Sequence, residues 1–135
     1  MKFFLTPIFL TLLFASCGKT IDVPSLQEQL DGVWKINLYI EERYDARLNS
    51  VSRDTTYCGD KDFMNFTRNE QVLVNFDSVA RLIWRYKIVD NRTLDIEGRK
   101  WTIAKLDDQH LHLLLNERDT SVKERNVMGY HLKRP

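Results

Sequence analysis

Apolar and polar side chains alternate with a period of two along much of the chain. The first clear run joins the apolar residues Trp34, Ile36, Leu38 and Ile40 with the intervening residues Lys35, Asn37, Tyr39 and Glu41. Residues two apart in a strand point to the same face of a sheet, so this run predicts a strand with one buried face. The same alternation returns at 82–88 and 111–115.

Shorter runs between these segments are also typical of strands. They cover residues 62–67, 71–76, 93–97, 100–106 and 126–133, and turn-forming residues separate them. The chain thus carries about eight strands joined mostly by tight turns, with no long helical pattern. Closure of such a sheet removes its free edges and buries its apolar face. The predicted fold class is all-β, an eight-stranded antiparallel up-and-down β-barrel.

The apolar faces of these runs predict the inside of the barrel. The inward set is Trp34, Ile36, Leu38, Ile40, Leu82, Trp84, Tyr86, Trp101, Ile103, Leu111, Leu113, Leu115, Met128, Tyr130 and Leu132. Its candidate pocket lining is Leu38, Ile40, Trp84, Tyr86, Trp101 and Tyr130, with the two tyrosines as polar handles. An eight-stranded barrel is either filled by its own side chains or holds one small ligand, and the pattern leaves both open.

The first 16 residues have the features of an export signal. Lys2 is followed by an apolar run from Phe3 to Ala15. This run is shorter than the roughly 20 residues of a membrane-spanning helix, and Pro7 interrupts it. The small residues before Cys17 resemble the lipobox of bacterial lipoproteins. That resemblance implies cleavage before Cys17 and its acylation by fatty acids such as palmitate, which would anchor the protein in a membrane.

The remaining chain divides into a tether and one domain. Residues 17–29 contain few large apolar side chains, whereas residues 30–135 carry the strand pattern. Ser25 and Glu28 have the spacing of a capping box, which predicts a short helical turn before the barrel. Gly18 follows Cys17 where an aspartate would favour the inner membrane, so the outer membrane is the expected location; its periplasmic and surface faces remain alternatives.

Charge excludes one class of partner. Residues 1–16 contain one lysine and no acidic residue, so their removal leaves 19 acidic residues and an equal number of basic ones. A balanced chain carries no basic patch by composition, and no nucleic-acid partner is expected.

Gly32-x-Trp34 at the start of the first strand resembles the lipocalin signature. The span from Leu30 to Arg134 is similar to the lipocalin-like lipoproteins of Bacteroidetes, which also carry a cysteine and an acidic stretch before an F-x-x-F strand. Here these are residues 58–62 and Phe63-x-x-Phe66, and the segment 101–115 resembles their late hairpin.

Barrel closure makes a prediction of its own about the chain end. The last strand of a closed antiparallel barrel with an even number of strands pairs with the first, which brings Arg134 close to Trp34. Lipocalins often carry an arginine stacked on this tryptophan, and the resemblance assigns that role to Arg134. A cation–π contact of this kind contributes about 1 to 2 kcal/mol when partly desolvated.

Candidate catalytic and metal-binding residues are few. His110 and His112 share a strand face and such a pair can hold a metal, but they lie opposite Leu111 and no third ligand is evident, so a solvated face is preferred. Cys58 lacks an evident base and is interpreted as a free thiol or an intermolecular disulfide. No metal, no cofactor and no enzymatic activity are predicted.

Two functions from different classes follow. The first is a non-catalytic binding protein that holds a small apolar or amphipathic ligand in the barrel. The alternative is a protein interaction module or inhibitor of the cell envelope with a packed barrel. In that case the polar segment 45–61, expected to be a loop over one mouth of the barrel, would contact the partner.

Overall fold

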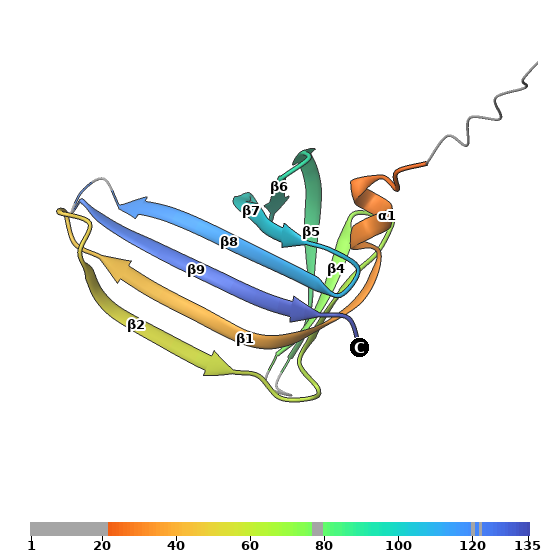
Figure 1. Ribbon diagram of the computed structural model, residues 1–135, viewed down its shortest axis with the longest axis horizontal. Coiled ribbons are helices and arrows are strands. Elements are labelled where there is room, and N and C mark those ends of the chain that lie inside the picture. The colour runs from red at the N-terminus through yellow and green to blue at the C-terminus, as the bar shows by residue number, and fades with distance from the viewer. Residues whose placement is uncertain (1–21, 77–79, 120, 122) are drawn as a thin grey trace, which may run out of the picture.

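The structure is a computed structural model that describes residues 22–76, 80–119, 121 and 123–135. In these ranges one short helix, α1 (Leu26–Leu30), precedes nine strands (Figure 1). The strands are β1 (Gly32–Tyr44), β2 (Ser50–Tyr57), β3 (Phe63–Phe66), β4 (Gln71–Phe76), β5 (Ala80–Asp90), β6 (Thr93–Ile96), β7 (Arg99–Leu106), β8 (His110–Asp119) and β9 (Glu124–Lys133). No helix in the same ranges has the length and hydropathy needed to cross a membrane. Cys17 lies outside the described residues.

Helix α1 begins at the predicted capping box. The Ser25 side chain accepts a hydrogen bond from the Glu28 backbone N–H, and the Glu28 carboxylate accepts one from the Ser25 backbone N–H. The Ser25 backbone N–H and the Ser25 hydroxyl, which also donates to the carboxylate, lower the pKa of Glu28 because they favour its charged form. The last turn of α1 contains no basic residue. Its terminal carbonyl groups therefore need donors from elsewhere in the chain.

Eight strands close into an antiparallel barrel. Around the ring the order is β1, β3, β4, β5, β6, β7, β8 and β9, and β9 pairs again with β1. Every neighbouring pair is antiparallel. The predicted all-β class, with eight barrel strands and a short N-terminal helical turn, is confirmed.

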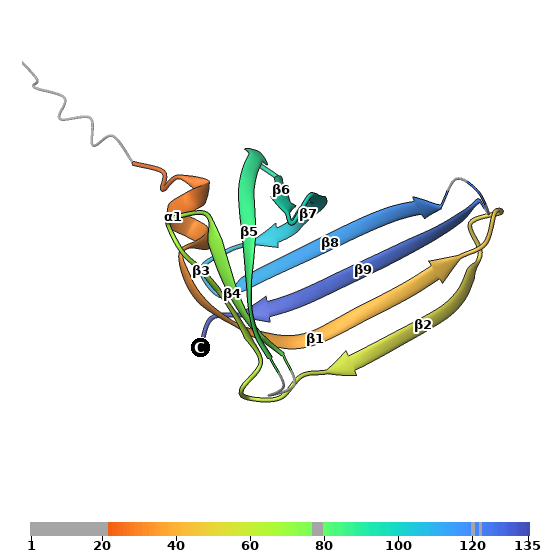
Figure 2. The same cartoon turned by 180° about the vertical axis from the view of Figure 1, so that it is seen from behind.

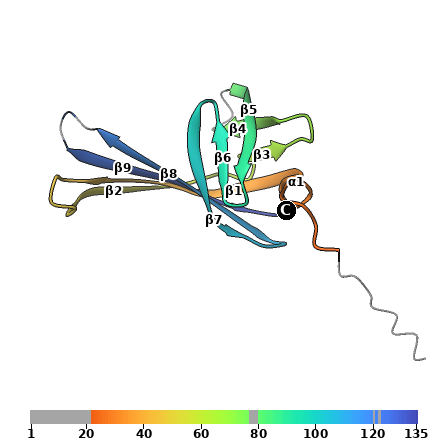
Figure 3. The same cartoon turned by 90° about the horizontal axis from the view of Figure 1, so that it is seen from above.

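The ninth strand, β2, lies outside this ring and pairs with residues 38–44 of β1. Sequence analysis expected a loop over 45–61, which is wrong for residues 50–57. Most β2 side chains are exposed on both faces, so the strand leaves no apolar alternation in the sequence. With residues 112–119 of β8 and 125–131 of β9, the paired parts of β1 and β2 form a four-stranded extension, here termed the projecting sheet. Figures 2 and 3 show it reaching well beyond the barrel.

A β-bulge at Asn37 separates the two halves of β1. Ile36 pairs with Leu132 of β9 while Leu38 pairs with His131, so Asn37 is an extra residue. Such a residue reverses the facing of everything after it. Leu38 and Ile40 therefore lie on the outer face of the projecting sheet, not on the inner face that the sequence pattern predicted.

The interior next to α1 is filled by apolar side chains. Leu30, Trp34, Phe66, Val72, Leu94, Leu111 and Leu113 have no accessible surface. A side chain that no water-sized probe touches has no space for a ligand beside it. This half of the barrel is therefore a packed core, as in other protein interiors.

Candidate functional site

Gly32 stands where α1 passes into β1. Its φ of +107° lies in the region that favours glycine. A Cβ at this position would lie only 2.9 Å from Nη1 of Arg134. Both the backbone conformation and the close approach of Arg134 therefore account for the glycine in Gly32-x-Trp34.

Trp34 and Arg134 supply the donors that the end of α1 lacks. Nε1 of Trp34 donates to the Leu30 carbonyl at 2.8 Å. The Arg134 guanidinium donates to the carbonyls of Gln29 and Asp31, each at 2.8 Å. Its Cζ lies 3.9 Å from the centroid of the Trp34 ring, the neighbour that barrel closure predicts. These contacts join α1, the first strand and the last residues into one closed end of the barrel.

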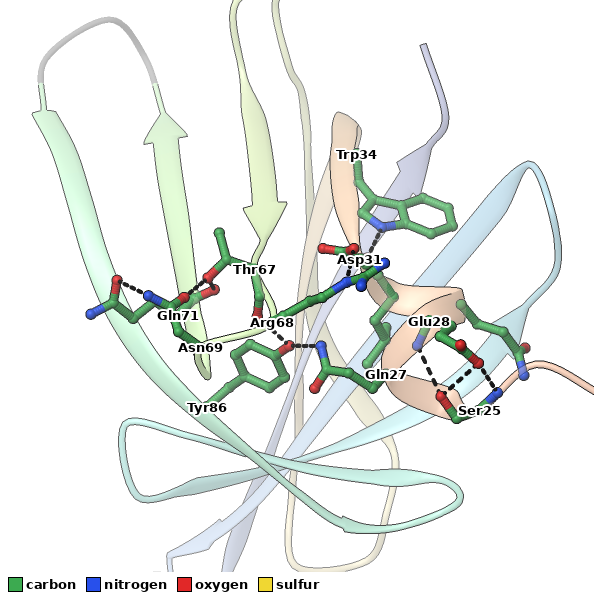
Figure 4. Close-up of polar contacts among 12 residues, drawn as sticks. Ser25, Gln27, Glu28, Asp31, Trp34, Thr67, Arg68, Asn69, Gln71 and Tyr86 are labelled. Carbon is green, nitrogen blue, oxygen red and sulfur yellow. Dashed lines mark hydrogen bonds and ion pairs between the residues drawn. The ribbon is translucent and has the colours of Figure 1, made fainter.

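Tyr86 belongs to the same closed end. Its ring is 1% exposed and its hydroxyl donates to the Thr67 carbonyl at 2.9 Å (Figure 4). The same hydroxyl accepts a hydrogen bond from the Gln27 side chain at 2.6 Å. Burial raises the pKa of Tyr86. Tyr86 therefore holds α1 against the barrel at the closed end.

The opposite, open end keeps apolar side chains accessible. Cys58, Phe76, Trp84, Met128 and Tyr130 pack against the core but remain partly exposed. Sequence analysis named Trp84 and Tyr130 as lining. Phe76 was missed, although the alternation Val72, Val74, Phe76 in 71–76 contained the signal. We take this open end as the candidate site.

A groove of about 460 Å³ includes two of these side chains, Cys58 and Phe76, and is lined by residues 56–62 and Phe76. Hydrogen bonds fix its wall: the backbone N–H of Gly59 donates to the Asp62 carboxylate at 2.6 Å, and the Asn75 side chain donates to the Lys61 carbonyl at 2.6 Å. Its size falls in the range of about 300 to 1,000 Å³ typical of small-molecule sites. The groove thus offers a pre-formed apolar and polar surface.

Three aromatic rings continue the open end onto the inner face of the projecting sheet. The centroids of Tyr39 and Tyr130 are 5.0 Å apart, and those of Tyr130 and Trp101 are 5.4 Å apart. Trp101 is 6% exposed, and its ring packs against that of Tyr130. Burial raises the pKa of Tyr130 to about 12. Sequence analysis placed Tyr39 opposite the buried face of its strand, because the alternation of apolar and polar residues does not reveal the bulge at Asn37.

Cys58 does not have the environment of a catalytic thiol. Burial raises its pKa, and the nearby Asp62 carboxylate raises it further. Both effects disfavour the thiolate, which is the reactive form. Cys58 contributes an apolar surface to the groove.

The histidines of β8 and β9 lie on the outer face of the sheet, with His112 and His131 at the start of the projecting sheet and His110 two residues before it. His110 contacts the Asp107 carboxylate at 3.0 Å, and the ring of His112 stacks on His131 of β9 with centroids 4.0 Å apart. The pKa of His112 is lowered by burial and by His131, and that of His131 by burial and by Arg53. Sequence analysis missed His131 because the register between β8 and β9 is not visible in the chain.

The lowered pKa values of His112 and His131 predict that acid destabilises the fold. An unfolded chain takes up protons near the ordinary histidine pKa of about 6.5, whereas the folded chain does so only at lower pH. The two depressed pKa values therefore stabilise the fold above that pH, and the contribution is lost as the pH falls. Urea unfolding between pH 7.5 and 5.0 is expected to show this loss, and the His112→Asn/His131→Asn variant should show a flatter pH dependence. Equal slopes in the two proteins would contradict it.

In the part of the chain that the structure describes, no three His, Cys, Asp or Glu side chains are placed to hold a metal ion. Comparison of the chain with models of protein families and with curated proteins finds no match.

Proposed function

We propose that this chain is a lipocalin-like, non-catalytic binding protein that takes a small apolar or amphipathic molecule at the open end of its barrel. One observation carries the proposal: the 460 Å³ groove lies next to side chains that are apolar yet still accessible. The packed half leaves no room inside the barrel, and the groove of about 400 Å³ at the closed end lies outside it, between α1 and the neighbouring strands. The proposed ligand site is therefore shallow and at the rim, and it does not lie deep inside the barrel.

The groove suits a ligand with a flat apolar part. Phe76 and Cys58 offer an apolar surface, while the exposed Lys61 and Asp60 stand at the rim for polar groups. The phenol of the neighbouring Tyr130 can act as a hydrogen-bond donor to such a ligand. Aromatic side chains of this kind combine apolar contact area with a polar tip.

Titration with Nile red, an uncharged fluorescent dye, tests this function. The wild-type protein should bind the dye saturably, and Phe76→Ala should weaken binding about tenfold because it removes a large part of the apolar surface. Leu106→Ala is the matched control, since Leu106 also packs partly exposed on the core but lines the groove beside α1 at the closed end. Absence of a saturable site, or equal weakening by the two substitutions, would contradict the proposal.

The anchor is a second part of the proposal. The described chain approaches α1 through residues 22–25, on the closed-end side (Figure 1). A lipid on Cys17, which precedes this segment, would leave the open end free to meet its ligand. We propose attachment to the outer membrane, in keeping with the lipobox resemblance and Gly18.

Metabolic labelling with an alkyne analogue of palmitate checks the anchor. The wild-type protein should be labelled and should sediment with membranes, whereas Cys17→Ser should be unlabelled and soluble. A Cys58→Ser variant controls for labelling at the other cysteine. Labelling that depends on Cys58 instead of Cys17 would refute this assignment.

A further inference from the structure

Strand β2 forms an open edge of the projecting sheet. In the described residues it pairs with β1 alone, so its other side presents backbone N–H and C=O groups without a neighbouring strand (Figures 1 and 2). Such an edge is a template for adding another strand. This surface is distinct from the proposed ligand groove, which only Thr56 and Tyr57 of β2 touch.

The edge carries few of the devices that usually block strand addition. Natural edges are protected by proline, lysine, bulges or very short length. Residues 50–57 contain no proline or lysine, and the six pairs of residues 52–57 with β1 are in continuous register; the one irregularity, which leaves Val51 without a partner in β1, lies near the start of the strand. Val51 and Tyr57, both of strand-forming type, are 62% and 81% exposed.

A second copy of this chain fits the edge poorly. In such a dimer, a two-fold axis normal to the sheet would relate the two β2 strands. The outer faces of both copies then lie on the same side of the combined sheet, so an outward-facing residue of one copy can lie opposite only an outward-facing residue of the other. The two antiparallel registers with the longest overlap then place Arg53 opposite Arg53 of the other copy, or Asp54 opposite Asp54. Like charges directly opposite each other destabilise a strand pair.

We propose that the β2 edge binds an extended segment of a partner protein by antiparallel strand addition, and that the segment carries a basic residue followed by an acidic one. Antiparallel pairing places the acidic residue opposite Arg53 and the preceding basic residue opposite Asp54. Both charges of β2 are exposed. Glu42 of β1 is the cross-strand neighbour of Arg53, but no salt bridge among the described residues involves Arg53 or Asp54. Backbone hydrogen bonds supply the affinity, and the two charges set the register.

Two capped peptides of equal composition test the proposal by fluorescence anisotropy. The first is Ile-Thr-Val-Lys-Glu-Thr-Val-Thr, and the second exchanges its Lys and Glu. The wild-type protein should bind the first at least about fivefold more tightly, because two favourable cross-strand pairs replace two unfavourable ones. The Arg53→Asp/Asp54→Arg variant, whose net charge is unchanged, should reverse this preference.

Further measurements separate strand addition from other kinds of contact. Two N-methylated forms of the first peptide are then compared, one methylated on its odd-numbered residues and one on its even-numbered residues. Only one of these sets of N–H groups points towards β2, so only one form should lose binding. Equal binding of the two peptides, no reversal in the exchanged variant, or binding that survives both methylation phases would overturn the proposal. Sedimentation that shows a dimer sensitive to the exchange would assign the edge to a second copy instead. Nile red binding should be the same in the Arg53→Asp/Asp54→Arg variant and in the wild-type protein. The proposal for the β2 edge and the proposal for the ligand groove are therefore tested independently.

Discussion

Replacement of Trp34 by alanine is expected to lower the free energy of unfolding by about 3 to 5 kcal/mol, as large core truncations do. The Trp34 side chain has no accessible surface, so its removal leaves a cavity at the closed end. It also removes the donor to the Leu30 carbonyl and the ring on which Arg134 stacks. Urea unfolding followed by circular dichroism measures the loss.

Two further variants, one at the neighbouring Val33 and one at Trp34 itself, serve as controls for this prediction. Val33→Ala alters a side chain that is 39% exposed and should change stability by less than about 1 kcal/mol. Trp34→Phe keeps most of the ring but not its N–H, and should fall between the two. A stable Trp34→Ala protein that has lost Nile red binding would show that the Gly32-x-Trp34 region is a binding site and not a structural one.

Arg134→Ala is expected to cost about 2 to 4 kcal/mol, an unusually large effect for a residue next to the chain end. Its guanidinium makes two hydrogen bonds to carbonyls at the end of α1 and covers the Trp34 indole. The helix has no basic residue in its last turn, so Arg134 is the cation that complements its C-terminal dipole. Removal of Arg134 should therefore loosen α1 as well as the barrel end.

Substitution by lysine distinguishes the charge from the shape of the group. A single ammonium cannot reach two carbonyls and stack at once, so Arg134→Lys should recover less than half of the lost stability. The exposed neighbour Lys133→Ala should change little and serves as the matched control. Full recovery in Arg134→Lys would mean that charge alone accounts for the effect. A double-mutant cycle with Trp34→Ala should give a coupling energy of about 1 to 2 kcal/mol.

The closed end could be predicted because local patterns and barrel closure agree there. The capping box at Ser25 begins a real helix, and the alternation upstream of Asn37 places Trp34 and Ile36 in the core. Closure with an even number of strands then brings Arg134 to Trp34 without any knowledge of the loops between them.

The open end and the projecting sheet were less accessible to sequence reasoning. Strand β2 has little buried surface, so its only signal is β-propensity, which is weak without an alternation. The contact of His112 with His131, and the position of Tyr39, depend on register and on a bulge. The periodicity of a single strand reveals neither the register between strands nor the position of a bulge.

The bulge at Asn37 decides which side chains of β1 lie beside Tyr130. Because Asn37 has no partner in β9, the pairs Ile36–Leu132 and Leu38–His131 follow each other directly, as they would in a strand without this residue. A strand that lost Asn37 would therefore keep Tyr39 on the inner face. A strand that took Asn37 into the ladder would place Leu38 there instead and would shift each later residue of β1 by one position along β9. The surface of the projecting sheet thus depends on how one residue is accommodated, while Trp34 and Ile36 keep their places in the core.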